Sequence, residues 1–364
     1  MARQCLAAAA LATAVLTTAS CVAFVPYDLQ PLPSAPAAPD LSQRSRLVFV
    51  VVGDSGRGNE AQHAVGRLMQ AVCAALSCDF AIAPGDLIYD RGVHLQRPGQ
   101  AWDPQFASKF EAPFRGVTFP FWSVPGNHDW GTLGSVQAEI DYTNASETWR
   151  MPFNHFPIER LPAWIRIYGL DTVLIDEAAS RPDERAEADQ QLADAKAYLC
   201  DGGATPAWRL AFGHHPLYSS GQHGREANNL TNLRQRLGGL IETCRVQVYF
   251  AGHEHMQELL QVSGPTARPG LAFVQVIQGA GSEARTNDRP LPETGVTTWG
   301  VKREPGFGLV QVDRERMTVE YYGTRSSPRP DGRTPVPFLA FSLQPEGVST
   351  LQRLERVNRP TGLH

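Results

Sequence analysis

The sequence predicts an α/β fold, in which a largely buried sheet is covered by helices on its faces. Short apolar runs rich in β-branched residues recur along the 364 residues, and segments that favour helices lie between them. Most of these runs are continuously apolar, which is typical of strands buried on both faces. In such folds the loops at the carboxyl ends of the strands carry the functional site.

The first 23 residues have the layout of a secretory signal peptide. One early Arg is followed by a stretch of small and apolar residues that is too short and too rich in Ala for a membrane span. The residues before Cys21 also resemble a lipoprotein cleavage site, so cleavage near Ala23 and lipidation of Cys21 both remain open. We therefore expect an exported protein that is periplasmic, secreted or held at a membrane by a lipid anchor.

The rest of the chain divides into a linker, a domain and a tail. Residues 24–43 are rich in Pro and predict an extended tether. The catalytic domain is expected over 44–343, and the tail 344–364 looks irregular, as does the stretch 283–305. Helices are predicted at 60–76, 187–200 and 229–241.

Five predicted strands end at a Gly that is followed by polar residues. They are 47–52, 80–84, 119–125, 208–212 and 246–251, and later strands are predicted at 271–279, 306–312 and 317–323. Glycine at such a point lets the backbone turn sharply and approach a bound ion or ligand closely.

Charge and cysteine content narrow the possible partners and compartments. The formal net charge of −4 gives no reason to expect a nucleic acid partner. Four cysteines remain after the leader, namely Cys73, Cys78, Cys200 and Cys244. An even number suits two disulfides in an exported protein, with a local Cys73–Cys78 loop as one option, but four buried thiols are equally compatible with the sequence.

The polar residues at the five strand ends are suited to binding metal ions. Carboxylate, amide and imidazole groups follow in order, and they are enough for two ions with one shared carboxylate. Two neighbouring cations can hold the oxygens of a phosphate ester and lower the pKa of a bound water. The residues are Asp54, Asp86, Asn127, His128, His214, His253 and His255.

The ordered motifs GDSG, GDLIY, GNHD, GHH and GHEH resemble those of the calcineurin-like metallophosphoesterase superfamily. The resemblance spans about residues 47–323. It implies a four-layer α/β/β/α sandwich, a fold that strand and helix periodicity alone would not have singled out.

Tyr89 narrows the resemblance to the small, mammalian-type purple acid phosphatases. It stands three residues after Asp86, where those enzymes place a tyrosinate on Fe(III), although an aromatic residue packing beside the site is the simpler alternative. A phenol becomes a good ligand only for a strongly acidic cation. The segment GHHPLYSSGQHG also resembles that group, with His214 as ligand, His215 as a neighbour and His223 near the leaving group.

The resemblance implies a role for each residue. The first ion, Fe(III), would be bound by Asp54, Tyr89 and His255, and the second, Zn(II), Fe(II) or Mn(II), by Asn127, His214 and His253, with Asp86 bridging the two. A metal-bound hydroxide would attack the phosphorus. His128 would face the phosphate with Asp129 orienting it, and His128 and His223 would stabilise the transition state or protonate the leaving group.

The resulting hypothesis is an exported phosphatase that hydrolyses small phosphate monoesters. A phosphodiesterase or nucleotidase with the same metal site is one alternative, and a non-catalytic metal-binding scaffold is another. Substrate preference is expected to reside in 90–115 and 283–305. The sequence does not indicate an oligomeric state.

Overall fold

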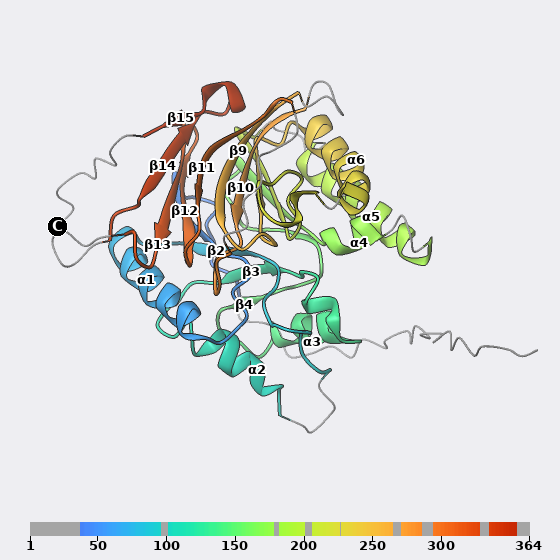
Figure 1. The fold of residues 1–364 in the computed structure, drawn as a ribbon, viewed down its shortest axis with the longest axis vertical. Coiled ribbons are helices and arrows are strands. Elements are labelled where there is room, and N and C mark those ends of the chain that lie inside the picture. The colour runs from blue at the N-terminus through green and yellow to red at the C-terminus, as the bar shows by residue number, and fades with distance from the viewer. Residues whose placement is uncertain are drawn as a thin grey trace, which may run out of the picture. The chain divides into compact units, whose positions relative to one another are not determined.

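Two β-sheets form the centre of the fold, and helices cover the outer face of each (Figure 1). The computed structural model describes residues 37–95, 101–177, 182–200, 206–225, 227–264, 271–285, 294–327 and 335–354. The predicted leader and residues 24–36 lie outside this part of the chain. Within it, no helix combines the length and the apolar character needed to span a membrane.

The first sheet begins with the N-terminal strands and is completed by the C-terminal ones. Strands β1 to β4 run parallel to one another, whereas β12 to β15 join in antiparallel pairs, with β12 beside β1. In spatial order the strands are β15 (Gln352–Arg353), β14 (Leu339–Leu343), β13 (Met317–Gly323), β12 (Gly306–Asp313), β1 (Arg46–Val51), β2 (Phe80–Pro84), β3 (Phe121–Val124) and β4 (Trp149–Arg150).

The second sheet is built from the middle of the chain. Strands β6, β7, β8 and β10 are parallel, and β5, β9 and β11 add to them in antiparallel pairs. In spatial order the strands are β11 (Val296–Lys302), β9 (Gln257–Ser263), β10 (Ala272–Gln278), β8 (Val248–Ala251), β7 (Trp208–Gly213), β6 (Ile165–Leu170) and β5 (Phe156–Pro157).

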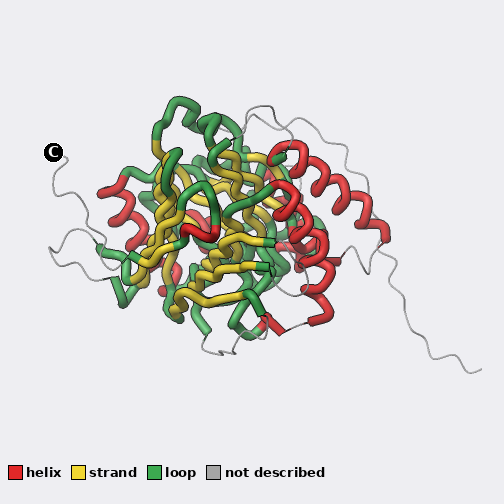
Figure 2. The backbone as a smooth tube through the Cα atoms, turned by 90° about the horizontal axis from the view of Figure 1, so that it is seen from above, coloured by secondary structure: helices red, strands yellow, loops and turns green. Residues whose placement is uncertain are grey.

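Each sheet has its own group of helices, with the strands between the two groups (Figure 2). On the first sheet these are α1 (Glu60–Leu76), α2 (Pro104–Phe106), which continues into a π-helical turn (Ala107–Glu111), and α3 (Ser135–Tyr142). On the second they are α4 (Thr172–Glu177), α5 (Pro182–Leu199) and α6 (Ala227–Cys244). Short 3₁₀ turns lie at Asp129–Gly131, His223–Arg225 and Val348–Thr350.

The side chains of β1 show how the layers arise. Leu47, Phe49 and Val51 point into the core between the sheets, while Val48 and Val50 pack under the helices on the other face. Both faces of the strand are therefore buried, which is why its sequence is continuously apolar. Three apolar cores separate four layers, so the expected α/β/β/α sandwich is confirmed.

The structure corrects the sequence analysis at two irregular stretches. Strand β11 lies inside 283–305, although residues 286–293 of that stretch are outside the described part. Each of its residues is either half-buried or exposed, and it has no continuous apolar run from which a strand could be predicted. In the predicted tail, β15 pairs with β14 and Leu351 joins the core between the sheets. Leu41, near the end of the predicted tether, is also buried against this core.

All four cysteines of the domain are paired. Cys73 and Cys78 close a short loop at the end of α1. Cys200 and Cys244 join the chain just after α5 to the last residue of α6. The structure thus selects two disulfides over four buried thiols.

Candidate metal centre

The polar loops after β1, β2, β3, β7 and β8 meet at one edge of the two sheets. Backbone hydrogen bonds join them across the sheets, for example from Asp54 N to Gly85 O at 3.0 Å and from Gly252 N to His214 O at 3.0 Å. Because the carboxyl ends of parallel strands share an edge, motifs far apart in sequence become neighbours.

Asp54, Tyr89 and His255 bring three ligand atoms together. The Tyr89 hydroxyl lies 3.0 Å from Asp54 Oδ1 and 3.1 Å from His255 Nε2, and the last two atoms are 3.5 Å apart. All three side chains are buried. These are the residues that the resemblance gives to the first ion.

Asn127, His214 and His253 form a second triangle. Asn127 Oδ1 lies 2.9 Å from His214 Nε2 and 3.1 Å from His253 Nδ1, and the two nitrogens are 3.1 Å apart. His214 Nδ1 faces the Pro84 carbonyl at 3.0 Å and therefore carries the ring proton, which leaves a lone pair on Nε2. An amide oxygen and an imidazole lone pair so close together suit a cation between them.

Asp86 lies between the two triangles. Its Oδ1 is 3.5 Å from His214 Nε2, and ligand atoms of Asp54, Asp86 and His214 all fall within 4.8 Å of one another. The side chain is buried at 1% exposure, and its Oδ1 also accepts a hydrogen bond from His128 N at 3.0 Å. This is the position that a bridging carboxylate requires.

The ionisation of these groups fits bound cations. Burial, reinforced by the charge of Asp86, raises the pKa of Asp54. Burial lowers the pKa of His214 and, with the neighbouring His215, that of His253, and it lowers the pKa of His255 to about 4. Lowered pKa values favour the neutral imidazoles that coordinate metal ions, and buried carboxylates are stabilised by positive charge nearby. The residues present therefore fit a two-metal centre.

Three of the seven residues have a backbone that non-glycine residues rarely adopt. The φ angles of Asp54, Asp86 and His253 are 54°, 53° and 67°, in the left-handed region. Each such residue costs on the order of 1 kcal/mol or more, and strain of this kind persists where the surroundings enforce it, often at functional sites.

The glycines of the motifs leave room for these side chains. A Cβ at Gly126 would lie 2.3 Å from Asp86 Oδ1, and one at Gly252 would lie 2.4 Å from Asp54 Oδ2. Neither contact is sterically possible. The absence of a side chain at both positions therefore lets the backbone lie against the two aspartates.

Asp129, which was predicted to orient His128, forms its hydrogen bonds with the backbone of two loops. Its carboxylate does not contact the His128 ring but accepts hydrogen bonds from Gly126 N, Leu87 N and Ile88 N at 2.8–3.1 Å, so it joins the GNHD loop to the GDLIY loop. Burial raises its pKa to about 8. His128 is positioned instead by the Asp90 carbonyl, 2.5 Å from its Nδ1, and by the Tyr89 ring, 4.5 Å away between centroids.

His223 lies beside the second triangle, where its ring is 4.5 Å from that of His253. Its loop is held by two glutamates that the sequence analysis did not select. Glu254 accepts a hydrogen bond from His223 N at 2.8 Å, and Glu258 accepts one from the Ser220 hydroxyl at 2.5 Å. Glu254 is the Glu of the GHEH motif, so the motif itself is a signal from which the sequence analysis could have selected this residue.

Further residues around the centre were also missed. The Arg57 guanidinium lies over the Tyr89 ring at 4.3 Å from its centroid and forms an ion pair with Glu283 at 2.7 Å. Glu283 in turn lies 3.8 Å from His255 Nδ1. His215, expected only as a neighbour, has a ring nitrogen in a second candidate ligand group with His214 and His253. No local motif marks these contacts.

Comparison with known proteins gives matches over most of the chain. A model of the Calcineurin-like phosphoesterase family matches residues 47–257. Tartrate-resistant acid phosphatase type 5 of Sus scrofa is 31% identical over 302 residues, which cover 76% of this chain and 83% of that protein.

Two solved structures share the fold at 16% identity each. GAP50, described as the anchor in the inner membrane complex of Plasmodium, has a TM-score of 0.64 and covers 87% of this chain and 91% of its own. A purple acid phosphatase from yellow lupin (Lupinus luteus) seeds has a TM-score of 0.56 and covers 85% of this chain and 55% of its own.

Proposed function

Because this chain belongs to the calcineurin-like phosphoesterase family and is homologous to tartrate-resistant acid phosphatases, we propose that it is an exported two-metal phosphatase acting on small phosphate monoesters. The observation that carries the proposal is the convergence of seven side chains into two triangles of ligand atoms with Asp86 between them.

Each ion would be held by one triangle. Asp54, Tyr89 and His255 would bind the first ion, Asn127, His214 and His253 the second, and Asp86 both. When bound, the two cations would polarise the phosphate oxygens and supply an activated water.

The protein's own groups would handle the proton of the leaving group. His128 lies beside Tyr89 and His223 beside His253, and both are partly exposed, so both could reach a bound ester. His223, beside His253, is the better candidate to protonate the departing alkoxide, while His128 would donate to the phosphoryl oxygens. Asp129 would act only by holding the loop that carries His128.

Tyr89 supports Fe(III) at the first site and a divalent ion, Zn(II), Fe(II) or Mn(II), at the second. Burial and the charges of Asp54 and Asp86 raise the pKa of Tyr89 well above its ordinary value. Only a strongly acidic cation would displace the phenol proton from such a site. A Tyr ligand of this kind is what separates a purple acid phosphatase from other family members.

Two alternatives remain to be tested against this proposal. A phosphodiesterase or nucleotidase would use the same centre and differ only in the width of its pocket. A non-catalytic scaffold is compatible with the fold, since a structure described as an anchor shares it. Against it stands the complete set of seven candidate ligands together with His128, which a protein without turnover has no need to keep.

The test is metal analysis of the purified protein together with its visible spectrum and two assays. We expect one iron and one further metal per chain, and hydrolysis of 4-nitrophenyl phosphate well above that of bis(4-nitrophenyl) phosphate. Preference for the diester would favour the phosphodiesterase. Bound metal without turnover of either ester would favour the scaffold.

Export is supported by the two disulfides, which form and persist in oxidising compartments. Whether the protein is lipidated can be tested at Cys21. If it is, Cys21→Ser should move the protein from the membrane fraction to the soluble fraction, as seen by immunoblotting of fractionated cells. An unchanged distribution would indicate simple cleavage of the leader.

A further inference from the structure

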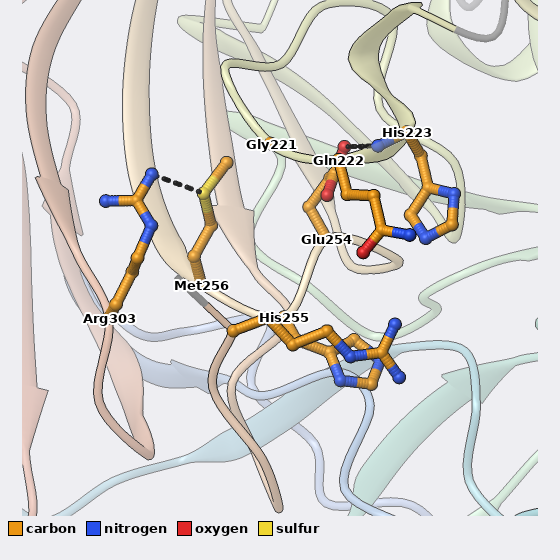
Figure 3. Close-up of a pocket in the computed structure, with 8 residues that line it drawn as sticks. Gly221, Gln222, His223, Glu254, His255, Met256 and Arg303 are labelled. Carbon is orange, nitrogen blue, oxygen red and sulfur yellow. Dashed lines mark hydrogen bonds between the residues drawn. The ribbon is translucent and has the colours of Figure 1, made fainter. Parts of the chain in front are cut away.

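A pocket opens beside the metal centre at the edge formed by His255 and His223. It is a shallow recess, and the space of about 250 Å³ within it includes open solvent. Figure 3 shows Arg303 and Met256 on one side, Gln222 and His223 on the other, and His255 below them. The full lining is Gly221, Gln222, His223, Glu254, His255, Met256, Arg285 and Arg303.

Two guanidinium groups belong to this lining. Arg303 directly follows β11, is partly buried, and approaches Met256 Sδ to 3.7 Å. Arg285 is tied to the centre through its backbone, because its N–H donates to the His255 carbonyl at 2.8 Å. Its Nε pairs with Glu283 at 3.2 Å, and Glu283 is shared with Arg57.

Three acidic groups lie near these arginines, and one of them, Glu283, pairs with Arg285. Glu254 is the one carboxylate in the lining, and it is 3% exposed with an oxygen bound to His223 N. Glu258 attracts Arg303 from behind but is buried and bonded to Ser220. The surface that a ligand would meet therefore includes both guanidinium groups, while the Glu254 and Glu258 side chains are buried.

The pocket is placed for the leaving group and not for the phosphoryl group that is transferred. The transferred group must reach both triangles and His128, yet His128, Asn127 and His214 are not among the lining residues. The pocket does include His223, the candidate donor to the leaving oxygen. A substrate whose phosphate lies on the metal centre would extend past His223 into this space.

We propose that Arg303, with Arg285, selects substrates whose leaving group carries a second anionic group, a carboxylate or another phosphate. The planar guanidinium presents a fork of N–H donors that matches carboxylate and phosphate oxygens. Both arginines lie in 283–305, the stretch expected to govern substrate preference. This inference depends on the proposed phosphatase function.

The experiment compares phenyl phosphate with 3-carboxyphenyl phosphate, which differ by one carboxylate in the leaving group. In Arg303→Gln, the ratio of kcat/KM for the carboxylated ester to that for phenyl phosphate should fall about tenfold, as expected for one lost charge-assisted hydrogen bond. Most of the fall should be in KM. Arg303→Lys, which keeps the charge without the fork, should give an intermediate ratio.

Lys302→Gln is the matched control. Lys302 is the neighbouring cation, but it lies over the Phe338 ring at 5.5 Å and is absent from the pocket lining, so the ratio should not change. A ratio that stays constant in Arg303→Gln, or an equal loss with both esters accompanied by a lower Tm, would overturn the proposal and leave the phosphatase function intact. If the wild-type enzyme hydrolyses neither ester, the proposed function itself fails.

Discussion

Tyr89 lies with its hydroxyl against Asp54 and His255 and its ring between Arg57 and His128. If the phenolate binds Fe(III), light absorption transfers charge from the ligand to the metal, and the oxidised protein should be purple. Tyr89→Phe removes the donor oxygen and keeps the ring in its packing. We expect loss of the visible band and weaker retention of iron, measured by absorption spectroscopy and metal analysis.

The control for this change is Tyr142→Phe, since the Tyr142 hydroxyl donates to Glu111 away from the metal centre. It should keep both colour and iron. A Tyr89→Phe protein that stays purple, or a colourless wild-type protein with two divalent metals, would contradict the purple acid phosphatase proposal. The membership of the broader family would be unaffected.

Replacing Asp86 should lower activity more than replacing any other single candidate ligand. Without its carboxylate both ions would lose a bond and would repel each other more strongly. We expect Asp86→Ala to lower kcat at least about 100-fold and to reduce bound metal, since even residues that only support ligands contribute 10- to 100-fold. Asp141→Ala is the control, because Asp141 is a half-buried carboxylate of α3 that accepts a hydrogen bond from Gln137 and is not a candidate ligand. Near-normal activity with Asp86→Ala would exclude a shared carboxylate.

At the scale of elements, the loop from Ser219 to Gly224 is held against the start of β9 by Glu254 and Glu258. The fit is close, because a Cβ at Gly221 would lie 2.2 Å from Glu254 Oε2. Loss of the Glu254 carboxylate should therefore release His223 without removing a ligand.

Glu254→Ala should be most harmful where the leaving group needs a proton. We expect kcat for an alkyl phosphate to fall about tenfold or more, the lower range of a general-acid contribution, and kcat for 4-nitrophenyl phosphate to fall much less. Metal content should be retained. An equal loss of kcat with both esters would mean that Glu254 supports only the fold. The control for loss of a negative charge is Glu315→Ala, because Glu315 lies in the exposed turn before β13.

Elements that are buried on both faces could be predicted from the sequence, and partly exposed ones could not. The continuous apolar runs of β1 and β2 were located almost to the residue, and α1 coincides with the predicted helix. Strand β11 was missed because its residues are half-exposed and include Thr and Gly. Short strands such as β5 depend on their partner for definition and leave no pattern of their own.

The same limit applies within the site. The seven candidate ligands could be selected because each follows a strand end in a recognisable motif. Arg57 and Glu283 act on Tyr89 and His255 through contacts between distant segments, which no local pattern records. For Asp129, the motif indicated a polar residue but not its partner, since the backbone N–H groups of Leu87 and Ile88 reach it only in the folded chain.

At the scale of the whole molecule, the periodicity of the sequence could not predict that the strands form two separate sheets. Alternating strands and helices are compatible with one buried sheet as well as with two. The distinction arises from the C-terminal strands, because β12 returns to pair with β1 while β10 pairs with β8. Residues about 260 positions apart, such as Val48 and Gln311, become partners in the first sheet.

The two disulfides stabilise this molecule to different degrees. Cys73 and Cys78 are 5 residues apart, whereas Cys200 and Cys244 are 44 apart and join the ends of α5 and α6. Loop-closure entropy predicts a stabilisation of about 2 kcal/mol for the short loop and about 4 kcal/mol for the long one. The double variant Cys200→Ala/Cys244→Ala should therefore lower the free energy of unfolding more than Cys73→Ala/Cys78→Ala does.

Guanidinium denaturation of the metal-loaded proteins measures this difference. None of the four cysteines contacts a candidate ligand among the described residues, so the specific activity of the folded fraction should be unchanged in both variants. Under reducing conditions the wild-type protein loses both bridges, so it should unfold at a lower denaturant concentration than the oxidised Cys200→Ala/Cys244→Ala variant, which keeps Cys73–Cys78. Equal stability of the two variants, or a larger loss from the short loop, would show that the long-range bridge does not stabilise the second sheet and its helices.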